Sequence, residues 1–215
     1  MSRLTRFIPI LFLLTSTAFA DDLLQLVTKG SPAQIEAAIK AGAKVNDRSP
    51  DGLTALMMAV SADRDAEVVS ILLGAGADVN LHSKTGMTAL MYEVHFNDNP
   101  DVVRLLLKAG ANVYDQDIFG QTALMYAAEH NTSVRIISIL LNAHANVNDR
   151  TAGGMTALMY AAESNGNPEV ISALLKAGAN GKLKSDQGKT AFDYASENQC
   201  LKGTRQYEEL NAAKF

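Results

Sequence analysis

The chain has 215 residues, of which 47% are hydrophobic and 20% are charged, and its formal net charge is −4. This balance is typical of an ordered protein with a substantial core. The acidic sign argues against nucleic acid and anionic membrane surfaces as partners, and the single cysteine, Cys200, excludes an internal disulfide.

The first twenty residues have the pattern of a secretory leader. Two arginines give a positive start, an apolar run follows over residues 7–14, and Ala18-Phe19-Ala20 offers small residues around a cleavage point. The run is too short to span a bilayer, and a short membrane anchor is the alternative. We therefore expect a signal peptide over residues 1–20 and a mature chain that starts at Asp21. That mature chain would carry 17 basic and 23 acidic residues, a net charge of −6.

A glycine followed two residues later by a threonine recurs every 34 residues, and Gly154–Ala162 is one of the fullest copies. The glycines are Gly52, Gly86, Gly120, Gly154 and Gly188, and the threonines are Thr54, Thr88, Thr122, Thr156 and Thr190. A fixed period of this size indicates a stack of repeated units rather than one globule. Glycine permits a tight turn, and the threonine hydroxyl can cap the helix that follows.

A second helix is predicted in each unit. Its expected N-caps are Asp65, Asn99, Ser133 and Asn167. Apolar residues at helical spacing follow each cap, and Ala-Gly-Ala then places a glycine where a helix commonly ends in the left-handed conformation. His144 takes this glycine position in one unit, which predicts a mildly strained cap.

The period divides the mature chain into six units. They are an N-terminal capping repeat at 21–48, full repeats at 49–82, 83–116, 117–150 and 151–184, and a C-terminal capping repeat at 185–215. Ser31 begins a capping box in the first unit, and the last predicted helix, over 204–213, is more polar than the others. Polar end units keep a solenoid soluble.

Helix–turn–helix units with a threonine at the helix start and a Gly-Ala…Val-Asn ending resemble the ankyrin repeat, in particular exported bacterial members. The resemblance implies an all-α ankyrin-repeat solenoid whose units are joined by β-turn fingers. It also implies protein–protein interaction through the concave face. The usual Thr-Pro-Leu-His start is here Thr-Ala-Leu-Met in four copies, and the period is one residue longer than usual. We expect the methionines, Met57, Met91, Met125 and Met159, to replace polar links with apolar packing.

By position, the resemblance places the binding residues at the finger tips and at the exposed ends of the first helices. The candidate partner-binding residues are Met87, His95, Phe96, Ile118, Phe119, Gln121, Glu129, His130, Met155 and Glu163. Phe96, Ile118 and Phe119 stand where the other units carry mostly small or polar residues. Exposed apolar groups rimmed by polar ones suggest a partner patch, and local packing is the alternative.

Three further features have an ordinary interpretation and a functional one. The four histidines occupy different positions of the 34-residue repeat, and no cysteine accompanies them. This favours surface positions and no metal site. Glu129, Glu163 and Glu197 form a column that is either solvated charge or a contact for a basic partner. Glu93 breaks a column of alanines, and a buried Glu would need a partner, for which His95 and Thr122 are candidates.

The chain shows no phosphate-binding loop, no nucleophile beside an ordered base and no cluster of metal ligands. We therefore expect a non-enzymatic, monomeric interaction module without a cofactor, which binds another protein. The expected compartment is the periplasm, with secretion as the alternative, and the expected role is an inhibitor, an immunity-type protein or an accessory protein of an envelope enzyme. The alternative is a small-molecule or cell-wall ligand binder, or an enzyme built on the repeats, which would need a deep pocket.

Overall fold

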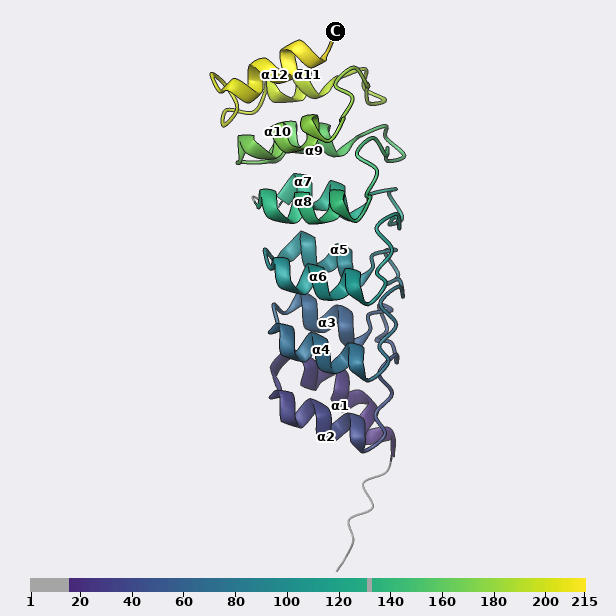
Figure 1. The fold of residues 1–215 in the computed structure, drawn as a ribbon. Helices are drawn as coiled ribbons and strands as arrows, with labels where there is room; N and C mark the ends of the chain where they lie inside the picture. The colour runs from purple at the N-terminus through teal and green to yellow at the C-terminus, as the bar shows by residue number, and fades with distance from the viewer. Residues whose placement is uncertain (1–15, 131–132) are drawn as a thin grey trace, which may run out of the picture.

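The computed structural model describes residues 16–130 and 133–215, so most of the predicted leader lies outside the described residues (Figure 1). Within these residues the chain forms twelve helices. They are α1 (Ser16–Lys29), α2 (Pro32–Lys40), α3 (Ala55–Ser61), α4 (Ala66–Gly74), α5 (Ala89–Phe96), α6 (Pro100–Lys108), α7 (Ala123–His130), α8 (Val134–Asn142), α9 (Ala157–Ser164), α10 (Pro168–Lys176), α11 (Ala191–Ala195) and α12 (Arg205–Ala213).

The helices stack in pairs along one axis, with α1 and α2 at one end and α11 and α12 at the other (Figure 1). The odd-numbered first helices pack against one another in one layer, and the even-numbered second helices form a second layer against them. This arrangement confirms the predicted all-α solenoid. Each predicted full repeat contains one helix pair, and the unit boundaries themselves stay predictions.

The first helices begin where the threonine column predicts. Each threonine hydroxyl accepts a hydrogen bond from the backbone N–H three residues later, at 3.3–3.4 Å. Asn99 and Asn167 cap the second helices α6 and α10 in a similar way, and Ser31 forms the predicted capping box. Asp65 stands at the N-cap of α4, as predicted, but its side chain makes no cap bond; its negative charge is favourable near the N-terminus of the helix dipole.

The turn before each first helix is a finger, and the five fingers of residues 48–54, 82–88, 116–122, 150–156 and 184–190 project from the same side of the stack (Figure 1). The finger glycines have φ between 73° and 80°, as the glycine column predicts. Backbone hydrogen bonds of 3.0–3.2 Å then join neighbouring fingers into a continuous ladder. They run from Lys84 to Asp51, Ile118 to Thr85, Ala152 to Phe119 and Asp186 to Gly153, each from N–H to C=O. The fingers are therefore held in register by their backbone.

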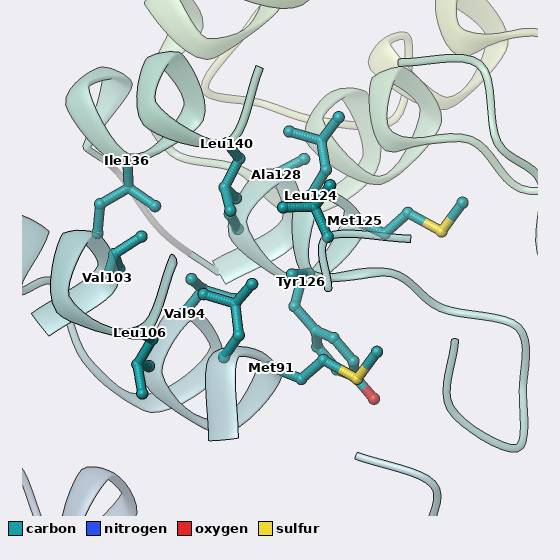
Figure 2. Packing of buried hydrophobic residues seen from close by; sticks show 14 of the residues in the cluster. Met91, Val94, Val103, Leu106, Leu124, Met125, Tyr126, Ala128, Ile136 and Leu140 are labelled. Carbon is teal, nitrogen blue, oxygen red and sulfur yellow. The ribbon is translucent and has the colours of Figure 1, made fainter. Parts of the chain in front are cut away.

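The core lies between the two layers and between successive units. Figure 2 shows Met91 and Val94 of α5 and Val103 and Leu106 of α6 close to the residues of α7 and α8. Met57, Met91, Met125 and Met159 are each 1% exposed, which confirms their predicted role in apolar packing. His144 has φ 66°, and this confirms the predicted strained cap at the end of α8.

Asparagine side chains connect the bases of successive fingers. The amide nitrogens of Asn46, Asn80 and Asn148 donate to a carbonyl of the next unit at 3.0–3.1 Å. The side-chain oxygen of each asparagine also accepts a backbone N–H from that next unit, at 2.8–2.9 Å. We call this pair of bonds the asparagine clamp. Tyr114 takes the equivalent position between repeats 83–116 and 117–150, and a phenol cannot make this pair of amide bonds.

Candidate functional site

Large apolar side chains are exposed on the face formed by the first helices and the fingers, which we call the first-helix face. Phe96, the last residue of α5, is 56% exposed, and Ile118 and Phe119 at the tip of the third finger are 63% and 61% exposed. The apolar residues of the two neighbouring units are otherwise mostly in the core. These three side chains are therefore the main apolar surface of repeats 83–116 and 117–150 on this face.

A buried aspartate fixes the finger that carries Ile118 and Phe119. One carboxylate oxygen of Asp117 accepts the backbone N–H groups of Phe119 at 2.9 Å and Gln121 at 2.7 Å. The other accepts the hydroxyl of Tyr126, on α7, at 2.7 Å. Burial and then the Asp117 carboxylate raise the pKa of Tyr126, so its hydroxyl stays a donor. The finger tip is thus fixed to the first helix behind it.

Aromatic rings continue from this helix to Phe96. The ring centroid of His95 lies 4.2 Å from Phe96, 5.0 Å from Tyr126 and 4.5 Å from His130. Tyr92 stacks on Phe96 with centroids 6.2 Å apart. We call these five residues the aromatic ridge. The ridge connects α5 to α7, and through Tyr126 and Asp117 it connects Phe96 to the finger of Ile118 and Phe119.

His95 has an unusual environment within the ridge. Its Nδ1 atom is buried and has no hydrogen-bond partner. Burial, and secondarily the neighbouring His130, lower the pKa of His95, because both disfavour the charged ring. His95 therefore favours the neutral form and offers a flat, weakly polar ring beside Phe96.

Acidic side chains adjoin the ridge on the side of α9. Glu129 contacts His130 at 3.3 Å and accepts from the Gln121 amide at 3.5 Å. Glu163, one unit further on, is exposed at the surface, and its pKa is raised by partial desolvation and then by the charge of Glu129. The next residue of the column, Glu197, is paired with Lys189 at 2.8 Å. The predicted acidic column is therefore continuous with the apolar patch.

The structure brings most of the predicted site residues together. The connected group is His95, Phe96, Ile118, Phe119, Gln121, Glu129 and His130. Glu163 and the partly buried Met155 belong to the next unit. Met87 is only 9% exposed and belongs to the core, contrary to the expectation of a surface residue, because its side chain packs with the apolar residues behind the second finger.

Glu93 is buried, but neither expected partner binds it. Its carboxylate accepts the side-chain amide of Asn97 at 3.2 Å, and the same amide nitrogen donates to the Val60 carbonyl. The expectation of His95 or Thr122 is therefore wrong, because the carboxylate lies toward the loop after α5. Burial raises the pKa of Glu93 to about 7, against the lowering effect of the Asn97 bond.

Two features of the site do not follow from the sequence patterns. The first is the Asp117–Tyr126 hydrogen bond, because nothing in the nine-residue separation of the two residues predicts that they touch. Ser185 and Tyr194 make the equivalent bond in the last unit, at 2.9 Å. Tyr114, 56% exposed, replaces the clamp asparagine next to the patch. Comparison of the asparagine column across the units would have identified Tyr114.

The structure gives little support for other kinds of site. Among residues 16–130 and 133–215, no group of three or more His, Cys, Asp or Glu side chains could hold a metal ion. No helix in the same residues is long and apolar enough to cross a membrane. Two grooves lie on the second-helix side, one between α8 and α10 and one between α2 and α4, away from the aromatic ridge. The expectations of no metal and no cofactor stay predictions.

Comparison with known proteins identifies the repeats. The family model described as "Ankyrin repeats (3 copies)" matches residues 23–117, 93–185 and 124–206. These matches overlap and together cover well over half of the chain. No curated protein matches the chain.

Proposed function

The chain belongs to the ankyrin-repeat family, and from this premise we propose that it is a non-enzymatic module that binds another protein through its first-helix face. Ankyrin repeats are generally protein-interaction modules. The binding site is centred on the third finger and the aromatic ridge, in repeats 83–116 and 117–150. In the family's geometry this is the concave face of the solenoid.

One observation carries the proposal: Phe96, Ile118 and Phe119 are each more than half exposed on a backbone that cannot move freely. Burial of the exposed part of each such side chain favours a complex by about 1–2 kcal/mol, before the costs of association. Because the inter-finger ladder and Asp117 already hold the finger in place, little conformational entropy is lost on binding. Large apolar anchors in a fixed arrangement are what a hot spot requires.

We further propose that the protein is exported, to the periplasm or beyond the cell, as the leader pattern of residues 1–20 suggests. In that compartment it would act as an inhibitor, an immunity-type protein or an accessory protein of an envelope enzyme. Cell fractionation with N-terminal sequencing tests export. A mature N-terminus at Asp21 supports the proposal, and an intact Met1 in the cytosol contradicts it.

Capture of partners from the envelope fraction tests the binding face. The intact chain and a Phe96→Ser/Phe119→Ser variant are immobilised side by side, with Phe215→Ser as the matched control, because Phe215 is 82% exposed at the far end of the stack. We expect the control to retain the partner and the double variant to lose it. Equal capture by all three proteins would mean that the proposed face is wrong.

A further inference from the structure

We infer that the partner segment carries a large apolar side chain and, about three residues away, a lysine or arginine. This inference rests on the proposed function and specifies the partner's chemistry. The apolar side chain packs on Ile118 and Phe119 at the tip of the third finger. The cationic side chain lies between Glu129 and Glu163, on the C-terminal side of the apolar patch.

The carboxylates of Glu129 and Glu163 are only partly balanced by the chain's own cations. Glu129 is contacted by the Gln121 amide and by His130, which is charged only if protonated. Glu163 is exposed; Glu129 and Glu197 interact unfavourably with its charge, and Lys189 interacts with it favourably. Lys189 forms its close ion pair with Glu197, at 2.8 Å, and not with Glu163. A cation supplied between Glu129 and Glu163 would relieve the repulsion between these two carboxylates.

The apolar patch and the carboxylates adjoin one another. Gln121 follows Phe119 in the same finger by two residues, and its side chain contacts Glu129. His130 contacts both Glu129 and the ring of His95, which lies against Phe96. A segment that covers the patch therefore meets the carboxylates at its edge.

Packing geometry sets the spacing within the partner. Phe96 ends α5, and Ile118 and Phe119 lie in the finger that precedes α7, whereas the carboxylates belong to α7 and α9, one unit further along. Packed helices lie about 8–10 Å apart, and an extended segment advances about 3.3 Å per residue. One unit therefore corresponds to about three residues of an extended partner.

The charge of this chain argues against a second copy as the occupant. Its formal net charge is −4, and the same face already carries Glu129, Glu163 and Glu197. Like charges brought together at an interface weaken association. A basic, apolar segment of a different protein complements the face better.

Peptide selection tests the inference directly on the chain, with random peptides in place of the natural partner. A phage-displayed library of random 12-residue peptides is selected on the intact chain, and enriched peptides are synthesised with a fluorescent label. Their affinities are measured by fluorescence polarisation against the wild type, Phe119→Ser and Glu129→Gln/Glu163→Gln. Glu67→Gln is the matched charge control, since Glu67 is exposed on α4, and Phe215→Ser is the matched apolar control.

We expect enrichment of peptides with a large apolar residue about three residues from Lys or Arg. Phe119→Ser should weaken their binding by roughly tenfold or more. The double Gln variant should weaken it roughly three- to tenfold, with a similar loss at high salt. Both controls should stay within about twofold.

Three other results would overturn the inference. Peptides that need Phe119 but lack Lys or Arg, and are insensitive to the Gln substitutions, would refute the cationic contact and leave the proposed face intact. Enrichment of no peptide that depends on Phe96, Ile118 or Phe119 would refute both proposals. Self-association that Phe119→Ser abolishes would show that a second copy is the occupant.

Discussion

The rings of His95 and His130 meet edge to face with their centroids 4.5 Å apart, although they belong to the first helices of successive repeats. This contact joins two repeats at the centre of the proposed binding face. Burial and then His130 disfavour the charged form of the His95 ring.

The first prediction concerns the titration of His95. Its folded pKa lies below the unfolded value of about 6.5, because of burial and then His130. The unfolded chain therefore binds more protons in this range, so this group makes stability fall as pH falls from about 6.5 through the folded pKa. NMR of the His95 ring should give a midpoint below 6.5, and His130→Gln should move it upward. A midpoint at or above 6.5 in the wild type would contradict the proposed environment.

Glu93 should have the opposite effect on the pH dependence of stability. Its folded pKa is about 7, against 4.5 for a glutamate carboxyl in water, so the folded chain binds more protons between these values. Stability from this group is greatest below pH 4.5 and is lost as pH rises through 7, by about 3 kcal/mol in total. Urea unfolding of the wild type and Glu93→Gln should diverge with pH over this range. Parallel profiles would show that Glu93 is not buried as described.

Gly86 should be less replaceable than Gly110, although both have positive φ. A Cβ at Gly86 would lie 2.8 Å from the backbone nitrogen of Ile118, whereas one at Gly110 meets nothing within 4 Å. Either change to Ala strains the backbone by about 1–2 kcal/mol, and only Gly86→Ala also displaces the third finger. We expect Gly86→Ala to unfold at lower urea and to weaken binding of selected peptides. Equal effects of the two substitutions would mean that the fingers are not in close register.

The asparagine clamp should stabilise the joints between repeats. Asn80→Ala removes bonds to the Gly110 carbonyl and the Asn112 N–H, and it should destabilise the chain by about 1–2 kcal/mol. Tyr114→Asn should introduce a clamp at the joint beside the patch and stabilise the chain. Hydrogen exchange at that joint should slow in Tyr114→Asn, and faster or unchanged exchange would argue against this role of the column.

Much of the fold follows from the repeat period. The glycine and threonine columns determine the fingers and helix starts, because each residue type is required by a local conformation that the chain repeats. Side-chain hydrogen bonds between different positions of the repeat are harder to predict. The position of Asp117 relative to Tyr126 depends on how the finger folds back on its helix, and Glu93 could have pointed toward several polar neighbours.

The candidate site was predicted partly. Phe96, Ile118 and Phe119 were identified because they depart from otherwise small or polar columns, and the structure exposes them. Met87 also departs from its column, yet it is buried, since a flexible apolar side chain at the edge of a finger can turn into the core. A residue that differs from its equivalents in the other repeats is therefore a candidate for function. Whether its side chain points to solvent or into the core is known only from the structure.

Site-specific photo-cross-linking tests the central claim most directly. A photoreactive phenylalanine analogue is placed at Phe119 on the first-helix face or at Ser70, an exposed residue of α4 on the second-helix face. The chain is then irradiated in its native compartment. We predict one dominant cross-linked protein from position 119 and little or none from position 70, with loss of the product when Phe96→Ser is added. The same product from both positions, or a product from position 70 alone, would contradict binding through the first-helix face.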